Sequence, residues 1–219
     1  MSDYRCPLSL EIIPRGTGWA DVKLDIGDDR FDCVISYIGD SIHDLIERVY
    51  YLYPDWPHDS YDYRIMEYYD EVKPVSTIDG ATDKHVWSDV PKRTEMVWDR
   101  EGSSVKWTLE RPATLESEFN VIITLEVLQE EESARIYQVK YKDLCYAVAK
   151  GATEVLVWYG LIGYYESTWM EDINIRHFLH IKEIALDMKI EMESAHKESH
   201  TIFSTRLGQE MDLLIRPLS

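Results

Sequence analysis

The sequence predicts an α+β fold in which an antiparallel sheet packs against helices. Three observations predict this class: strand-like alternation over residues 20–38, further strand patterns over 95–141, and helical spacing over 142–219. No linker, repeat or change in composition divides the 219 residues, so we expect a single domain. It should be strand-rich over 18–141 and helical over 142–219, with residues 189–219 compatible with an appended arm.

Residues 20–38 are predicted to form an antiparallel hairpin. Over residues 20–26 apolar and charged side chains alternate, which is the period of a strand with one buried face. The turn residues Gly27-Asp28-Asp29-Arg30 separate it from a second strand over 31–38. Apolar residues fall on both faces of this second strand, so we expect it to be covered on both sides.

A helix is predicted directly after the hairpin. Asp40 or Ser41 can accept a hydrogen bond from its free N–H groups, and Pro54 ends it. Its apolar residues recur at helical spacing and therefore share one face: Ile42, Leu45, Ile46, Val49 and Leu52.

Four more strands are predicted between residues 95 and 141. Strands over 95–99 and 105–109 form a hairpin through a turn at 100–103, with Trp98 and Trp107 on its inner face. Two further strands cover 119–128 and 135–141. The acidic residues 130–132 are expected at the solvated tip between them.

The remaining residues have helical spacing. One helix opens at Asp143 and reaches Trp158, with Gly151 tolerated or interrupting it, and residues 160–163 loosen the chain afterwards. Further helices are predicted over 176–192 and 204–215, with a polar bend at 194–201 between them.

Trp158, like Trp98 and Trp107, falls on an apolar face and is expected in the core. Trp56 and Trp169 lie among polar residues and are candidates for exposed anchors.

The charge of the chain excludes several functional classes. With 23 Lys and Arg against 41 Asp and Glu, the formal net charge is −18, which disfavours binding to a nucleic-acid backbone. No apolar run of about 18 residues predicts a membrane-spanning helix, and the N-terminus lacks the pattern of a secretory signal.

The three cysteines, Cys6, Cys33 and Cys145, form no metal-binding spacing and are expected as free thiols in a reducing compartment. We therefore expect a cytoplasmic protein.

No motif predicts catalysis or a cofactor. The nucleophile elbow and both glycine-rich nucleotide loops are missing from the sequence. His196 and His200 are four residues apart and His177 and His180 three apart, so either pair could face one metal ion on a helix. However, no third ligand follows at a suitable spacing, and packing or capping is the favoured role of the second pair. We expect neither a metal nor an organic cofactor.

One segment combines aromatic and acidic side chains. Residues 50–71 hold seven of the 15 tyrosines, Trp56, six acids and a single arginine, which gives the segment a net charge of −5. Tyrosine and tryptophan are common anchors at protein interfaces, and surrounding carboxylates attract a basic partner. Alternatively, Tyr50 and Tyr53 finish the helix, other tyrosines fill the edge of the sheet, and the acids only keep the loop soluble. On the first hypothesis, the partner contacts are Tyr51, Asp55, Trp56, Asp59, Tyr61, Asp62 and Tyr68.

Part of the sequence resembles a known class of bacterial protein. The stretches Gly18-Trp19-Ala20-Asp21-Val22 and Ser36-Tyr37-Ile38-Gly39-Asp40-Ser41-Ile42-His43-Asp44-Leu45-Ile46 look like the opening of small acidic immunity proteins of polymorphic-toxin and contact-dependent growth inhibition systems. The similarity extends over residues 18–180 as a pattern of elements, without an invariant motif. It implies a protein that binds a toxin domain and blocks it, with no active-site residue to carry over.

The sequence thus predicts an immunity protein, not an enzyme. Its expected target is a toxin domain that attacks nucleic acid and is therefore basic. A small enzyme or metal-binding protein with a His and carboxylate site is one alternative. A subunit of a larger assembly is another, because exposed aromatic side chains would serve it equally well.

Overall fold

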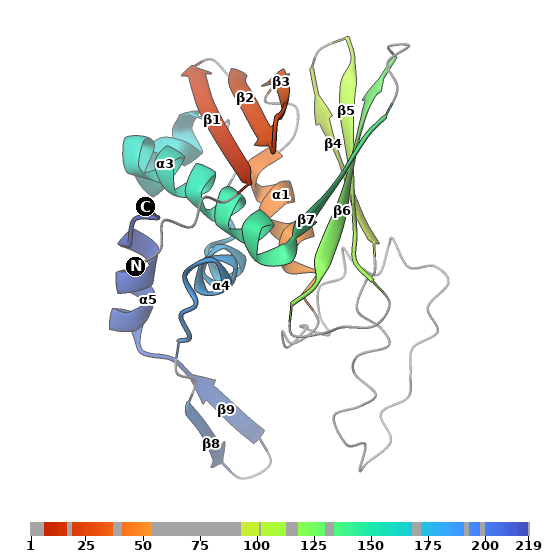
Figure 1. The fold of residues 1–219 in the computed structure, drawn as a ribbon. Coiled ribbons are helices and arrows are strands. Elements are labelled where there is room, and N and C mark those ends of the chain that lie inside the picture. The colour runs from red at the N-terminus through yellow and green to blue at the C-terminus, as the bar shows by residue number, and fades with distance from the viewer. Residues whose placement is uncertain are drawn as a thin grey trace.

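The structure of the protein is a computed structural model. It describes residues 7–16, 19–36, 41–53, 93–100, 102–112, 118–129, 134–167, 172–190, 193–197 and 200–218. Two antiparallel sheets pack with helices, so the predicted α+β class is confirmed (Figure 1).

The first sheet contains β1 (Leu8–Gly16), β2 (Trp19–Ile26) and β3 (Asp29–Ser36), paired in that order. The predicted hairpin is confirmed as β2 and β3, and Gly27 takes the positive φ of 61° that its turn requires. No strand is predicted from the sequence at β1, although Leu8, Leu10 and Ile12 alternate and are buried. Pro14 lowers the strand signal there, and an edge strand tolerates it.

The second sheet is the predicted four-stranded meander of β4 (Arg93–Asp99), β5 (Ser104–Glu110), β6 (Asn120–Leu128) and β7 (Arg135–Lys140). Trp98 and Trp107 lie on its inner face, as expected. Each is 1% exposed, and their ring centroids are 4.6 Å apart. The acidic tip at residues 130–132 lies outside the described residues.

Helix α1 (Ser41–Tyr50) buries the face that the sequence predicts. Helix α3 (Tyr141–Ser167) follows β7 without a loop and packs against β1. Gly151 does not interrupt it. A Cβ atom at Gly151 would lie 2.9 Å from the backbone oxygen of Leu10, so the glycine lets the helix approach the strand closely. The helix thereby covers the edge strand of the first sheet.

Helix α3 changes direction at Gly160, whose φ of 65° and ψ of 174° are not helical. Helix α4 (Ile175–Leu186) packs against α3 and α1 and begins at Asn174, whose side chain accepts a hydrogen bond from the His177 N–H. It ends before the predicted residue 192, because Asp187 adopts a left-handed conformation that terminates the helix.

The C-terminal residues differ from the prediction in one respect. In place of a bend at 194–201, β8 (Glu193–Lys197) and β9 (His200–Ser204) form an antiparallel hairpin, followed by α5 (Leu207–Ile215). The hairpin projects from the body in Figure 1. Within the described ranges, no helix is both long and apolar enough to cross a membrane.

Candidate protein-binding surface

The predicted contact segment is described only at its start. Asp55, Trp56, Asp59, Tyr61, Asp62 and Tyr68 lie outside the described residues, as does Trp169. Tyr51 is described and is 5% exposed. The prediction of six of the seven contacts therefore stays a prediction.

Tyr51 is part of the core and we withdraw it from the contact set. Its ring lies edge-on to His177 at 5.3 Å, and the ring of Tyr50 stacks on the same histidine at 3.9 Å. Tyr50 continues the apolar face of α1 one turn after Ile46, and Tyr53 stacks on Tyr141. For Tyr50 and Tyr53 the alternative hypothesis, that they finish the helix, fits these packed rings better than a partner contact.

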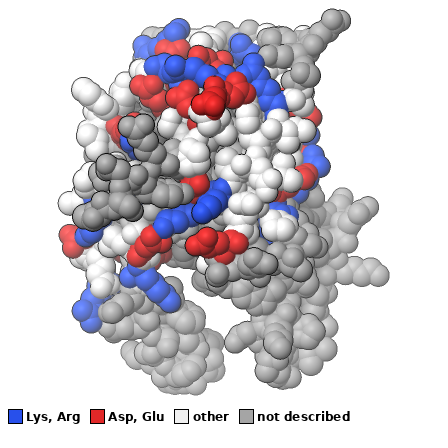
Figure 2. Space-filling model, in the orientation of Figure 1, with Lys and Arg blue, Asp and Glu red and all other residues white. Residues whose placement is uncertain are grey.

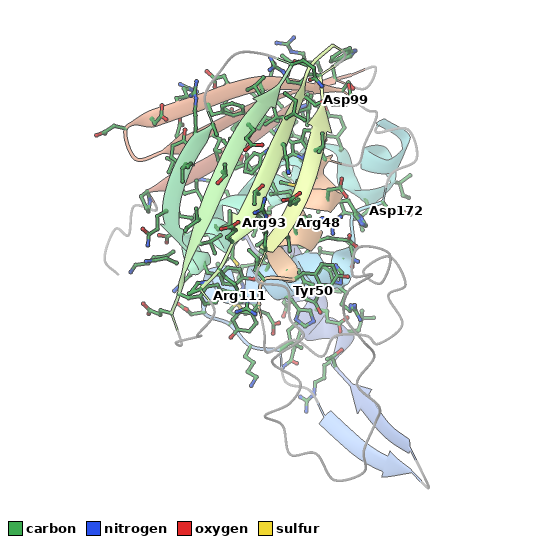
Figure 3. All side chains as sticks on the ribbon, turned by 90° about the vertical axis from the view of Figure 1, so that its right-hand side faces the viewer. Arg48, Tyr50, Arg93, Asp99, Arg111 and Asp172 are labelled. Carbon is green, nitrogen blue, oxygen red and sulfur yellow. The ribbon has the colours of Figure 1, made fainter. Side chains whose placement is uncertain are left out.

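A polar cluster next to these rings ties α1 to the segment before α4. His43 Nε2 lies 3.1 Å from Glu47 Oε1, and His43 Nδ1 lies 2.8 Å from the backbone oxygen of Asp172 (both Tyr50 and Asp172 are labelled in Figure 3). Both partners are acceptors, and a neutral imidazole can donate to only one of them at a time. Burial would raise the pKa of Glu47, but the hydrogen bond from His43 and the nearby positive charges lower it overall.

The two predicted histidine pairs do not face a common metal ion. His177 Nε2 lies 3.1 Å from Arg176 Nη2, whereas His180 Nδ1 lies 2.8 Å from Glu183 Oε2. His196 and His200 belong to different strands, so the helical i and i+4 relation does not exist. In the part of the chain that the structure describes, no three potential metal ligands come together.

The described cysteines are free, as predicted, and both are buried. Burial raises the pKa of Cys33 to about 12 and raises that of Cys145 still further. Both thiols are therefore protonated at neutral pH, which makes them unreactive core residues.

An open pocket of about 400 Å³ lies at one end of the second sheet, where the sequence predicts no site. Arg111, labelled at the lower end of this sheet in Figure 3, is buried in its lining and donates from Nη1 to the backbone oxygen of Pro112 at 3.0 Å. The lining is of mixed charge, with Glu110 and Glu118 beside this arginine.

The outer faces of both sheets carry paired charges. On the first sheet, Lys23 bonds to Glu11 at 2.8 Å and Arg30 to Asp32 at 3.0 Å. On the second sheet, Arg93 lies 3.0 Å from Glu110. Figure 2 shows acidic and basic side chains intermingled over the region where Figure 1 places β1–β3. These faces therefore carry acidic side chains that are partly paired with bases.

Large apolar side chains are exposed where α3 bends. Residues 155–165 contain no charged side chain, yet Trp158 is 85% exposed, so the prediction that it lies in the core is wrong. Tyr159 still reaches the backbone oxygen of Pro14, near the end of β1, at 3.5 Å. The exposed cluster, which we call the α3 patch, consists of Val157, Trp158, Leu161 and Ile162.

Helix α5 presents a second apolar surface, the α5 stripe, formed by Leu207, Met211 and Ile215. The opposite side of the helix is fixed to the body. Leu213 is fully buried, and Lys182 Nζ donates to the backbone oxygen of Leu214 at 2.9 Å. Figure 1 places α5 and the C-terminal end of α3 on the side of the molecule away from the four-stranded sheet. The α5 stripe follows i, i+4 spacing and is visible in the sequence, but only the structure shows that it is exposed.

Comparisons of the chain with protein-family models, with curated proteins and with solved structures found no match.

Proposed function

We propose that this protein binds a basic toxin domain of another protein and neutralises it, as an immunity protein does. The observation that carries the proposal is the combination of a net charge of −18 with large apolar side chains left in solvent on α3 and α5. An apolar helix face is normally buried, and contiguous exposed apolar patches on soluble proteins mark interaction sites.

The two properties have separate roles in binding. Tryptophan is the residue most often found at interface hot spots, so Trp158 is the favoured anchor of the α3 patch. The excess of carboxylates accelerates encounter with a positively charged partner and repels nucleic acid and anionic lipid. A toxin domain that attacks nucleic acid is itself basic at its substrate cleft and therefore meets both requirements.

The test is neutralisation in living cells. The C-terminal domain of a large secreted protein encoded next to this chain is expressed in a bacterium with and without the chain. We expect growth arrest by the domain alone and rescue on coexpression. A domain that arrests growth equally in both cultures, or a neighbourhood that encodes no such protein, contradicts the proposal.

A binding measurement then tests the acidic segment. Replacing Asp55, Asp59 and Asp62 together by Lys reverses three charges and should weaken the complex and reduce its dependence on salt. The dissociation constant is measured by calorimetry at low and high ionic strength. Unchanged affinity at low salt would exclude this segment from the interface and leave the surfaces of α3 and α5.

A further inference from the structure

We propose that the α5 stripe is a docking site for a basic amphipathic helix of a partner protein. The partner's nature as a toxin rests on the proposed function, whereas the docking mode rests on the geometry of α5 alone. The stripe is 70% exposed at both ends, at Leu207 and Ile215, and 47% exposed at Met211.

The shape of α5 favours a helix as the occupant. Leu207, Met211 and Ile215 form one i, i+4, i+8 row, which is the type of ridge that packs into the groove of a second helix. The nine residues of α5 span about 13 Å, or two to three helical turns, which suits contact with one partner helix. The backbone N–H and C=O groups inside a helix are already paired, so the stripe offers side chains only and cannot extend a partner's sheet.

Charge specifies the chemistry of the occupant. At roughly 100° per residue, Glu210 and Asp212 lie on opposite sides of the row, one next to each side of Met211, whereas Arg206 and Arg216 lie beyond the two ends of the helix. The Thr205 hydroxyl donates to Glu210, which holds this carboxylate in place. A helix with apolar residues on one face and Lys or Arg on both flanks complements this arrangement.

The same charges argue against a second copy of the chain. In a two-fold symmetric pair of α5 helices, the axis would pass near Met211, the middle of the stripe. The acidic residues next to Met211 would then approach their own copies, and each chain would add a net charge of −18. An anionic membrane surface is disfavoured for the same reason.

The attachment of α5 keeps the stripe in a defined position. Lys182 and Leu213 fix the inner side of the helix to α4, and Leu218, after the helix, is also buried. A preorganised helix loses little conformational entropy when it binds. The stripe is therefore presented as a rigid surface.

The test uses a fluorescent peptide of about 18 residues, built from Leu and Lys as an amphipathic helix, and its Leu and Glu counterpart. Binding is followed by anisotropy. We expect the intact chain to bind the Lys peptide and not the Glu peptide. The double variant Leu207→Ser, Ile215→Ser should bind the Lys peptide at least about tenfold more weakly. Asp212→Lys, which removes no apolar contact, should also weaken binding and reduce its salt dependence.

The matched control is Ile136→Ser, which removes an aliphatic side chain of similar exposure from β7. It should bind the Lys peptide as the intact chain does. The proposal is overturned if the double variant binds the Lys peptide as tightly as the intact chain does. It is also overturned if Ile136→Ser loses as much affinity as the double variant. A dimer of the intact chain in light scattering that the double variant abolishes would also overturn it. So would binding to phosphatidylcholine or phosphatidylglycerol vesicles that the double variant abolishes.

The toxin assay separates this proposal from the proposed function. If the double variant still neutralises the toxin domain as well as the intact chain, the docking site is wrong and the function stands. If binding of the Lys peptide requires the α5 stripe but the intact chain rescues no cells, the docking site stands and the proposed function is wrong.

Discussion

The tryptophans of this protein lie in two contrasting regions. Trp98 and Trp107 are 1% exposed between the second sheet and the elements that cover it, whereas Trp158 is 85% exposed at the bend of α3. Helix α3 shows the same contrast within one element. Its first half buries Leu144, Cys145 and Val148, and its second half leaves Val157 and Ile162 in solvent. The contrast shows that the apolar residues of this chain lie both in a packed core and on an exposed surface.

Trp107→Ala should produce the largest effect, because it opens a cavity in the centre of the core. We expect it to lower the free energy of unfolding by about 3–5 kcal/mol. Denaturant unfolding followed by circular dichroism measures this. A loss below about 1 kcal/mol would mean that the core is less tightly packed around this ring than the structure indicates.

Lys182→Met should change how stability depends on pH. Burial, together with the charge of Arg216, lowers the pKa of Lys182 from 10.5 to about 8. At pH values between about 8 and 10.5, Lys182 binds a proton more readily in the unfolded chain than in the native state. The free energy of unfolding of the wild type therefore rises with pH in this range. The variant lacks this contribution. Its stability relative to wild type should therefore fall by on the order of 3 kcal/mol between pH 7 and pH 11.

The difference between the two unfolding profiles is the relevant measurement, because other groups titrate in both proteins. Parallel profiles would show that the amine is solvated in the native state and that α5 is held in another way. The hydrogen bond from Lys182 would then not explain how the α5 stripe is held in position.

Gly151→Ala should be destabilising, although alanine is the better helix former. The added Cβ would lie 2.9 Å from the Leu10 oxygen, a backbone atom that cannot move away alone. We expect a loss of about 1–3 kcal/mol in thermal or denaturant unfolding. Gly163→Ala is the matched control, since its nearest neighbour would be 3.8 Å away, and it should be neutral or stabilising. Equal effects at both positions would contradict the close packing of α3 on β1.

Trp158→Ala should have the smallest effect on folding and a large one on binding. Because the side chain is mostly in solvent, the free energy of unfolding should change by no more than about 0.5 kcal/mol. Affinity for the toxin domain should fall at least about tenfold if this ring anchors the complex. A strongly destabilised variant would place the ring in the core after all and remove the contrast with Trp107.

Several elements follow from local patterns alone. The alternation in β2, β4 and β5 and the helical spacing in α1 predict these elements, because each has one face toward the core. Elements whose form depends on distant neighbours are harder to predict. Strand β1 has an alternating face but contains Pro14, and its place in the sheet depends on β2 and on the close approach of Gly151.

The candidate surface shows where sequence patterns fail. Tyr51 and Trp158 are both aromatic residues near a helix end, and the sequence predicts the first as exposed and the second as buried. The structure reverses both: His177 from α4 covers Tyr51, whereas Trp158 is 85% exposed. No spacing rule contains this information, because an apolar face is equally suited to a core and to a partner.

The sequence by itself determined the fold class, the order of most elements and the excess of negative charge, since these depend on composition and on periods of two or 3.6 residues. Tertiary structure decided which apolar faces are covered. Burial requires a second surface at contact distance, and residues far away in the chain supply that surface for the core but not for the α3 patch or the α5 stripe among the described elements.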